Sequence, residues 1–599
     1  MKCQVVRQLL KCGWSVKKLR YKLIEDSANN INDIIGTVLH NRGIENPSVY
    51  LNCTKTAGSE DWKLLDNIDT AVELFDAHFQ QKNKIVILMD NDVDGVTSAT
   101  LAYKYIKDLD ADYPVEIVVH NDQKSHGLCG DFELPKDTKL LWVPDAASND
   151  YEQCLALKAQ GIDVLITDHH ECSEDGLINI NSGAVVINNQ TSENYPNKSY
   201  CGCAVTREFC RALDEFYWTD YASKYNDLVA IADIADVMSL KDISTRREVG
   251  MGLANVRNKM LLEIFDAQSF STKGVISPFT VAFYIAPLIN SYIRMGTAED
   301  KLLLSRAFCE DESDTFEYIK RGDTVPTQEN IYQHCVRIMK SYKGKQDRQK
   351  EKGYKILKEK IEAYSSHDKV IICDCTEELE QALTGLTAIK IAEAFNKPIL
   401  LLRQRADDPN TFGGSGRAFD YCPIEDFRGF TENCPYVTLA HGHPQAFGVE
   451  MPAENISKAQ EWFNQQLTDM DFSKVYNVDF EIYADDVDFF LCRTVDEYKT
   501  LWAKEVEEPL FAIKGLVVDS KCGRICGKNN DTIQITWEDS PVKYVQFKVD
   551  ESNELYDWLN NNWDEDAVVE VNLIGTLELS DYNNITTGQV NIVDLEIVR

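Results

Sequence analysis

Short apolar runs rich in β-branched residues alternate with amphipathic segments from residue 84 to about 240. The runs are "KIVILMD", "VEIVVH", "TKLLWVPD", "DVLITDHH" and "AVVINN", with helix-like stretches such as 97–108 and 150–160 between them. This alternation is typical of βαβ units, and continuous apolar runs are typical of parallel strands that are buried on both faces. The pattern therefore predicts an α/β domain built on a parallel sheet.

Beyond residue 240 the pattern changes three times. Residues 240–365 have a helical pattern, and the α/β pattern then resumes with "KVIICDC" and "PILLLRQ" and continues to about residue 468. From about residue 476, strand-like runs alternate with turns such as "GKNND" and "SDYNN", which predicts a small antiparallel β-barrel. We expect a helical lead-in (1–80), a parallel-sheet domain (81–296), a helical connector (297–366), a second α/β domain (367–470) and a β-barrel (471–599).

Composition limits the possible functions. The formal net charge of the 599 residues is −35, which argues against a protein that coats nucleic acid nonspecifically, because neutralising phosphates requires lysine and arginine. No stretch approaches the ~20 apolar residues that span a bilayer, so we expect a cytoplasmic protein with no membrane contact. The 18 cysteines lie singly along the chain and are expected to be reduced thiols. "CGC", "CDC" and the Cys522/Cys526 pair resemble zinc half-sites but lack the partner set of a zinc site.

Acidic residues gather where the first apolar run ends. Three aspartates follow it at alternate positions: Asp90, Asp92 and Asp94. Gly95 is expected to permit a tight turn, and Thr97 or Ser98 to cap the next helix. Clustered carboxylates at neutral pH need a compensating charge, and a divalent cation is the usual one. An acidic loop without an ion is the alternative.

Further acids and two histidines lie in three other segments. Asp145, and Asp168 with His169 and His170, follow apolar runs of the same sheet, and Asp233 and Asp236 lie in "DLVAIADIADVMSL". In a parallel sheet, ligands bind beyond the carboxyl ends of the strands, so these side chains are expected to meet at one edge. Carboxylate and imidazole ligands without thiolates favour Mn²⁺ or Mg²⁺. The number of carboxylates is enough for two ions ~3.5–4 Å apart, the arrangement that serves phosphoryl chemistry.

The motifs "DNDVDGVTS", "DHH" and "DLVAIADIADV", in this order, resemble those of the DHH phosphoesterases. The segment "IAPLINSYIRMG" is similar to the N-x-x-x-R segment of the RecJ branch. The segments "GGSGRAFD" and "AHGHPQAFG" resemble the GS-x-R and GGH-x-x-A-x-G motifs of the DHH-associated domain. The strand-rich end resembles RecJ's oligonucleotide-binding (OB) barrel, so the resemblance covers nearly the whole chain.

The resemblance implies a 5′→3′ exonuclease that cuts single-stranded DNA with bound Mn²⁺ or Mg²⁺. The implied metal ligands are Asp90, Asp92, Asp94, Asp145, His169 and Asp236. His170, with Asp168, would act on the scissile phosphate. The implied substrate-binding residues are Asn290 and Arg294 in the first α/β domain and Ser415, Arg417 and His443 in the second, across a cleft that admits one strand.

Four positions depart from the family pattern. Asn91 stands where an aromatic residue is common, and Asp233 stands where a small residue is expected and adds negative charge. Leu288 replaces an arginine, which is expected to weaken phosphate binding. His441 replaces a glycine, which is expected to alter a turn or add a proton donor.

Two other functions are compatible with the same motifs. One is a phosphodiesterase for short oligonucleotides or cyclic dinucleotides, although such an enzyme has no need of a barrel whose Trp537 and Tyr544 could stack on bases. The other is a catalytically inactive, RecJ-like replication scaffold whose acidic surface binds a basic protein partner.

Overall fold

A computed structural model describes residues 18–24, 33–56, 58–122, 125–320, 322–364, 367–561, 567–582 and 585–598. The chain forms two compact units. The first unit comprises Arg42–Gly344 and Lys499–Glu507, and the second comprises Met1–Asn41, Lys345–Tyr498 and Glu508–Arg599. None of the described helices combines the length and the apolar character needed to cross a membrane.

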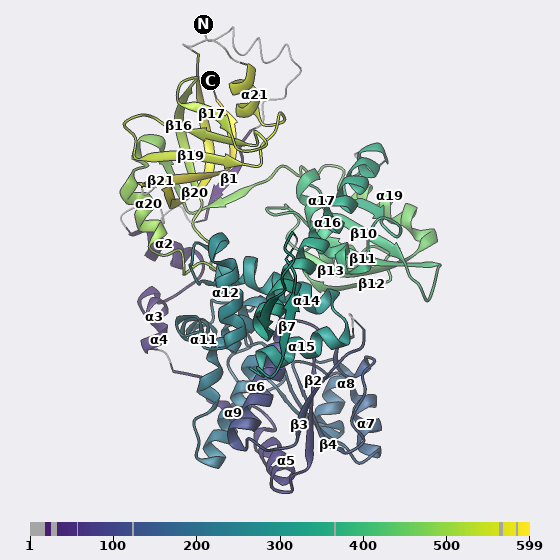
Figure 1. The fold of residues 1–599 in the computed structure, drawn as a ribbon. Helices are drawn as coiled ribbons and strands as arrows, with labels where there is room; N and C mark the ends of the chain where they lie inside the picture. The colour runs from purple at the N-terminus through teal and green to yellow at the C-terminus, as the bar shows by residue number, and fades with distance from the viewer. Residues whose placement is uncertain are drawn as a thin grey trace. The chain divides into compact units, whose positions relative to one another are not determined.

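The first unit contains a five-stranded parallel sheet with the strand order β3-β2-β4-β5-β6 (Figure 1). Its strands are β2 (Lys84–Met89), β3 (Val115–Val119), β4 (Thr138–Pro144), β5 (Asp163–Asp168) and β6 (Val185–Asn188). Each strand coincides with one of the five apolar runs. The prediction of an α/β domain with a parallel sheet is therefore confirmed.

Both faces of this sheet are buried, which explains the continuous apolar runs. In β2, the side chains of Ile85 and Ile87 belong to one core cluster, and those of Val86 and Leu88 belong to another. Helices α5, α6 and α9 pack on the first face and α7 on the second. Their bounds are α5 (Ile68–Gln80), α6 (Val93–Leu109), α7 (Tyr151–Ala159) and α9 (Gly202–Tyr217).

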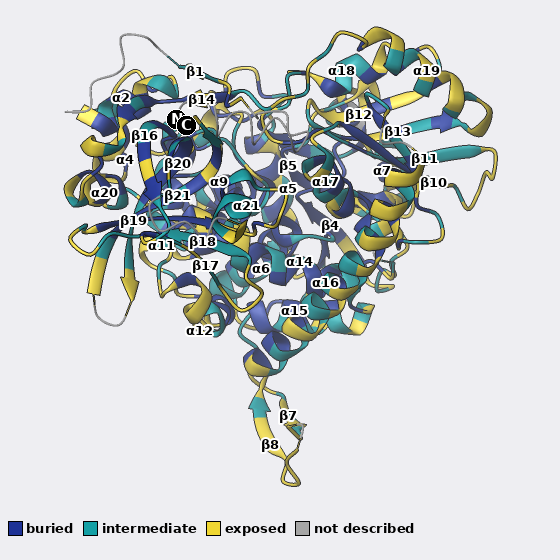
Figure 2. Ribbon diagram, turned by 90° about the horizontal axis from the view of Figure 1, so that it is seen from above, coloured by how far each residue is buried: buried dark blue, intermediate teal, exposed yellow. Residues whose placement is uncertain are grey.

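The rest of the first unit is mostly helical, as predicted for residues 240–365. Its main helices are α10 (Asn226–Ala235), α11 (Ile243–Ala254), α12 (Lys259–Thr272), α14 (Ala286–Met295), α15 (Ala298–Phe308) and the start of α16 (Ile331–Tyr364). One feature was not predicted: a hairpin of β7 (Thr315–Tyr318) and β8 (Thr327–Asn330), which extends away from the helices in Figure 2 with many exposed residues. Both strands have only four residues, and β8 has no apolar residue, so the alternation of Phe316 and Tyr318 with polar residues in β7 is the only strand signal in the hairpin.

The second unit contains a mixed five-stranded sheet with the order β12-β13-β11-β10-β9. Its strands are β9 (Ile371–Asp374), β10 (Ile399–Gln404), β11 (Thr411–Arg417), β12 (Leu439–His443) and β13 (Ala446–Pro452). β9 and β10 pair in parallel, and the other pairs are antiparallel. Helix α17 (Thr384–Phe395) packs on β10 and β11.

The strand-rich end of the chain forms a seven-stranded sheet with the order β15-β16-β20-β21-β19-β18-β17. Its strands are β15 (Phe480–Tyr483), β16 (Phe511–Asp519), β17 (Gly523–Cys526), β18 (Thr532–Ile535), β19 (Val542–Phe547), β20 (Val568–Tyr582) and β21 (Ile585–Ile597). The pairs β15–β16 and β19–β21 are parallel, so the sheet is mixed rather than antiparallel. No pairing of the described strands joins β15 to β17, so a closed barrel is not confirmed.

The predicted helical lead-in lies partly outside the described residues, which omit 1–17, 25–32 and 57. Its described part includes helix α2 (Ile34–Asn41) and a short strand, β1 (Tyr21–Leu23), which pairs in parallel with β14 (Tyr476–Val478). The division into five domains remains a prediction.

Candidate metal centre

The loop from β2 to α6 brings the first acids together without a separate turn. Helix α6 begins at Val93, and Asp92 is its N-cap, with a side chain that accepts a hydrogen bond from Gly95 N at 2.9 Å. The expected cap at Thr97 or Ser98 is therefore wrong, because Asp92 itself satisfies the first free N–H groups of the helix. A Cβ at Gly95 would lie 2.6 Å from the carbonyl oxygen of Asp90, so the glycine permits this close approach rather than a turn.

The N-terminus of α9 holds the carboxylate of Asp94. Gly202 N donates to Asp94 Oδ2 at 2.6 Å, and Cys203 N donates to Asp94 Oδ1 at 2.8 Å. The positive end of the helix dipole stabilises a negative charge at this position. A Cβ at Gly202 would lie 2.5 Å from Asp145, so glycine is needed where the helix start meets the acids.

The backbone is held in unfavourable conformations beside two of the acids. Asp145 follows β4 with φ +69°, and Val237, which follows Asp236, has φ +59°. Left-handed backbone at residues other than glycine costs ~1–3 kcal/mol each and is concentrated at functional sites. The placement of Asp145 and Asp236 therefore lowers the stability of the fold.

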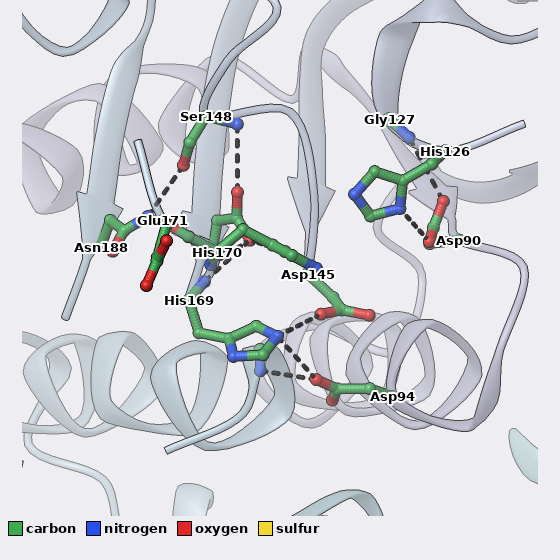
Figure 3. A network of polar contacts seen from close by, with 12 residues as sticks. Asp90, Asp94, His126, Gly127, Asp145, Ser148, His169, His170, Glu171 and Asn188 are labelled. Atoms are coloured by element: carbon green, nitrogen blue, oxygen red, sulfur yellow. Dashed lines mark hydrogen bonds and ion pairs between the residues drawn. The ribbon is translucent and has the colours of Figure 1, made fainter. Parts of the chain in front are cut away.

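Three carboxylates converge on the ring of His169. Figure 3 shows those of Asp94 and Asp145 beside this ring. His169 Nε2 lies 3.4 Å from Asp145 Oδ1, 3.4 Å from Asp236 Oδ2 and 3.8 Å from Asp94 Oδ2. Both His169 Nε2 and Asp145 Oδ1 are buried without a hydrogen-bond partner. Buried polar atoms are normally satisfied, so this convergence of unpartnered donors and acceptors fits a divalent cation.

Ligand atoms of three groups of side chains lie within 4.8 Å of one another. The groups are Asp94, His169 and Asp236; Asp145, His169 and His170; and Asp90, Asp92 and Asp145. All six predicted metal ligands are therefore brought to one edge of the sheet.

The buried carboxylates of this cluster lie close enough to raise one another's pKa. Burial, and then the neighbouring aspartates, raise the pKa of Asp92 to about 6 and that of Asp236 to about 8. The same causes raise the pKa of Asp145 well above its usual value. Burial lowers the pKa of His169, which favours the neutral imidazole that binds metals. A bound cation would relieve this repulsion.

Asp168 lies behind the cluster and is absent from these groups. Its carboxylate accepts hydrogen bonds from the backbone N–H groups of Ser148, His169 and His170, and from His170 Nδ1 at 2.8 Å. Burial alone would raise its pKa, but His170 holds the pKa well below the usual range. Burial would likewise lower the pKa of His170, yet Asp168 raises it to about 9. Asp168 is thus placed to orient His170.

Two histidines of the site were not among the predicted residues. His126 Nδ1 lies 2.6 Å from Asp90 Oδ2, and buried His120 Nε2 lies 3.6 Å from Asp90 Oδ1. Burial would raise the pKa of Asp90, but these two histidines lower it to about 2. His120 directly follows β3, so the rule that ligands lie beyond the carboxyl ends of parallel strands, applied to this strand as well, would have indicated it.

Asp233 does not add the full negative charge that was expected. It is completely buried on α10, accepts a hydrogen bond from Cys201 N at 3.1 Å, and its Oδ2 has no partner. Burial raises its pKa to about 8. At neutral pH the side chain therefore holds its proton.

Asn290 and Arg294 lie one turn apart on α14. No described residue forms an ion pair or hydrogen bond with Arg294, and Asn290 Oδ1 is buried without a partner. Leu288 is only 5% exposed and belongs to the hydrophobic core. A longer basic side chain at position 288 would have to leave that core, so leucine here is a packing residue.

Ser415 and Arg417 alternate on β11 in the second unit. A Cβ at Gly385, at the start of α17, would lie 2.7 Å from Arg417 Nη2 and 3.4 Å from Ser415 Oγ. Arg417 donates only to the carbonyl oxygens of Gly416 and Phe447, so among the described residues it has no carboxylate partner. The start of a helix, a hydroxyl and a free guanidinium together suit an anion.

His443 ends β12, opposite Ala446 of β13, which also pairs with Arg417 on its other side. His441 is exposed within β12 and pairs with Gly448. It therefore lies outside the two-residue turn that joins these strands.

The parallel sheet and the acids, histidines and helix start at its edge define a DHH-type phosphoesterase domain. The family model described as "DHH family, N-terminal domain" matches residues 84–238. The chain belongs to the DHH family, which confirms the resemblance of its motifs.

Similarity to RecJ-like proteins extends over almost the whole chain. It is 33% identical over 587 residues to a protein of Bacillus subtilis (strain 168), provisionally named as an SPbeta prophage-derived single-strand DNA-specific exonuclease, YorK; the match covers 97% of this chain and 99% of that protein. It is 24% identical to the single-stranded-DNA-specific exonuclease RecJ of the same organism, over 95% of this chain and 68% of RecJ. A crystal structure of Thermus thermophilus RecJ in complex with Mn²⁺ matches with a TM-score of 0.66 and 17% identity, over 97% of this chain and 79% of that one.

Proposed function

We propose that this chain is a metal-dependent exonuclease that hydrolyses single-stranded DNA in the 5′→3′ direction. The observation that carries the proposal is the convergence of Asp94, Asp145 and Asp236 on an unpartnered, buried imidazole nitrogen of His169. The relatives named as single-strand DNA-specific exonucleases support the substrate class. The direction of cleavage rests on the resemblance to RecJ.

We propose Mn²⁺ or Mg²⁺ as the cofactor, bound as two ions. Asp94, His169 and Asp236 would hold one ion, and Asp90, Asp92 and Asp145 the other. Oxygen-rich ligand sets with imidazole and no thiolate suit these ions. When bound, they supply the positive charge that lowers the pKa of a water and offsets the charge that develops on the phosphoryl oxygens.

The side chains around the ions have separate tasks. The backbone N–H groups at the start of α9 fix the Asp94 carboxylate. Asp168 is a positioning residue, because it engages His170 Nδ1 and leaves Nε2 free. Since the pKa of His170 is raised to about 9, its Nε2–H is charged at neutral pH and donates to a phosphate oxygen. Backbone strain at Asp145 indicates that the surrounding structure fixes this acid before the substrate arrives.

Phosphates of the strand would bind to Arg294 and Arg417, for which no carboxylate partner lies among the described residues. Arg294, with Asn290, serves the first unit, and Arg417, with Ser415 and His443, serves the second. In a chain with a net charge of −35, guanidinium groups free of carboxylates are available to bind an anion bidentately. Local contacts of this kind reconcile an acidic protein with a nucleic-acid substrate.

The seven-stranded sheet is the candidate OB-like module of the proposed exonuclease. Tyr544 is only 3% exposed, so it belongs to the core and cannot stack on a base. Trp537 is half-buried. Its ring contacts the ring of Tyr544 edge to face, with the two ring centroids 6.0 Å apart. Any stacking by this pair is therefore assigned to Trp537 alone.

A time course on single strands labelled at either end, with and without Mn²⁺, tests the proposal. We expect Mn²⁺-dependent release of label from the 5′ end first, with no cutting of duplex DNA, and loss of hydrolysis in Asp94→Asn. Cleavage of a dinucleotide but not of a long strand would support an oligonucleotide phosphodiesterase instead. Tight Mn²⁺ binding without turnover would support a scaffold. A basic protein partner and a cytoplasmic location remain predictions from the sequence.

A further inference from the structure

Two histidines of the site are held by aspartates in the same way. His170 Nδ1 donates to Asp168 Oδ1 at 2.8 Å, and His126 Nδ1 donates to Asp90 Oδ2 at 2.6 Å. A carboxylate only accepts, so both rings carry the proton on Nδ1. No described residue forms a hydrogen bond with Nε2 of either ring. Each pair therefore presents a free Nε2 on a ring whose orientation is fixed. The paired carboxylate favours the imidazolium form, in which Nε2 also carries a proton and donates to an anion.

The rings of His126 and His170 are half-exposed and lie beside the buried ring of His169. The ring centroids of His126 and His170 are 4.8 Å apart, and those of His170 and His169 are 4.5 Å apart. The side chains of His126 and His170 are 51% and 42% exposed, whereas that of His169 is 8% exposed. A buried imidazole suits a ligand, and two half-exposed ones beside it suit contact with a substrate. Figure 3 shows His126 and Asp90 beside the cluster.

Hydrogen bonds from a buried lysine hold the loop that precedes His126. Lys301, on α15, is completely buried and donates to Asn91 Oδ1 at 2.7 Å and to the carbonyl oxygens of His120 at 3.1 Å and Asp122 at 2.5 Å. Asn91 in turn donates to the carbonyl oxygen of Ser125 at 2.7 Å. The buried ammonium requires these three acceptors, because an unpaired buried charge is strongly destabilising. It ties the loop before His126 to the residue between Asp90 and Asp92.

We propose that His126 is a second substrate-contacting imidazole, which binds the same phosphate group as His170 through its Nε2, and that Lys301 is the positioning residue that holds it there through Asn91. The inference rests on the proposed function. It also explains the departure at Asn91, because an aromatic side chain there offers no acceptor to the Lys301 ammonium and no amide N–H to Ser125.

Two substitutions of His126 separate substrate contact from support of Asp90. An asparagine amide reaches the position of Nδ1 and keeps a donor to Asp90, whereas a glutamine amide reaches the position of Nε2. We expect kcat/KM for a single-stranded oligonucleotide to fall roughly ten- to hundredfold in His126→Asn, the range for loss of one hydrogen bond to a charged group. The loss should be smaller in His126→Gln.

Binding measurements supply a readout that is independent of turnover. In EDTA, His126→Asn should bind a 5′-phosphorylated single strand more weakly than the wild type, while its calorimetric affinity for Mn²⁺ alone is unchanged. The matched control is His78→Gln, since His78 pairs with Asp163 at 3.0 Å at the start of β5, remote from the cluster. Full activity in His126→Asn, or an equal loss in His78→Gln, would overturn the inference. Inactivity of the wild type would instead refute the proposed function.

Lys301→Met tests the positioning role. We expect a loss of kcat/KM similar to that of His126→Asn and no further loss in the double variant, because both changes act through one loop. Lys198→Met is the control, since Lys198 Nζ also donates to two backbone carbonyls, those of Asn189 and Ser192, but far along the chain from the His126 loop. If Lys301→Met does not fold, Asn91→Asp keeps the lysine paired and removes the donor to Ser125. Additive losses in the double variants would refute the positioning role.

Discussion

Replacing Asp233 by asparagine should change how stability depends on pH. Asp233 is completely buried, with one backbone donor and one carboxyl oxygen without a partner. Burial, with a smaller contribution from Asp94, raises its pKa to about 8, against ~3.9 in an unfolded chain. Between these values the folded protein holds a proton that the unfolded chain releases. The stabilisation is therefore complete below about pH 4 and is lost as pH rises towards 8.

The size of the effect follows from the width of this interval. Each pH unit well inside it costs about 1.4 kcal/mol, and the slope halves at the folded pKa, so wild-type stability should fall by about 2 kcal/mol between pH 6 and pH 8 through Asp233 alone. The amide of Asp233→Asn does not titrate and has nearly the same shape. The variant should thus gain about 2 kcal/mol relative to the wild type over that interval.

Urea denaturation of the EDTA-treated protein at pH 6 and pH 8, followed by tryptophan fluorescence, measures this difference. Trp142 is completely buried in β4 of the same unit and reports on its unfolding. Asp227→Asn on the same helix is the control, because Asp227 accepts backbone hydrogen bonds from Leu228, Arg257 and Asn258 and its replacement should cost stability at both pH values. An unchanged difference between wild type and Asp233→Asn at the two pH values would refute the reasoning.

Three further predictions concern the metal centre and the phosphate contacts. Asp94→Asn and His169→Ala should abolish Mn²⁺-dependent hydrolysis while circular dichroism remains that of the wild type, because both side chains serve the cation rather than the core; residual activity in either would discard the site. Mn²⁺ should raise the thermal unfolding midpoint more at pH 8.5 than at pH 5.5, because the raised pKa values of Asp92 (about 6) and Asp236 (about 8) make the metal-free protein lose stability as pH rises; an equal shift would contradict this. Arg417→Lys should raise KM about tenfold with little change in kcat, since lysine cannot form the bidentate contact; an unchanged KM in steady-state assays would exclude that contact.

The sequence predicted the sheet well because its physical signal is strong. Strands buried on both faces must be apolar throughout, and all five runs became strands. The same rule placed Asp90, Asp145 and Asp168 at one edge. It did not separate the acids that point into the cluster from Asp168, which points behind it, because side-chain direction after a strand depends on loop backbone such as the left-handed residue at Asp145.

Other features depend on contacts between distant segments. The start of α6 was expected too late, because Asp92 caps the helix and also belongs to the metal cluster. His126 lies in a polar loop with no periodicity, and only its pairing with Asp90 identifies it. The expected effects of Leu288 on phosphate binding and of Asp233 on the local charge came from a resemblance to other sequences. The structure shows that both side chains are buried, and burial determines what each of them does. Position in a sequence does not reveal whether a side chain meets the core or the solvent.

The phosphate contacts proposed for Arg294 and Arg417 also predict how binding responds to ionic strength. Each phosphate that a cation neutralises on a single strand releases counterions, and the affinity falls with a logarithmic slope of about −0.7 per contact. Two contacts predict a loss of about sevenfold between 50 and 200 mM salt, against a thousandfold or more for a protein with many such contacts. With so few arginine contacts, this acidic protein is expected to keep its strand at salt concentrations that would release it from a basic one.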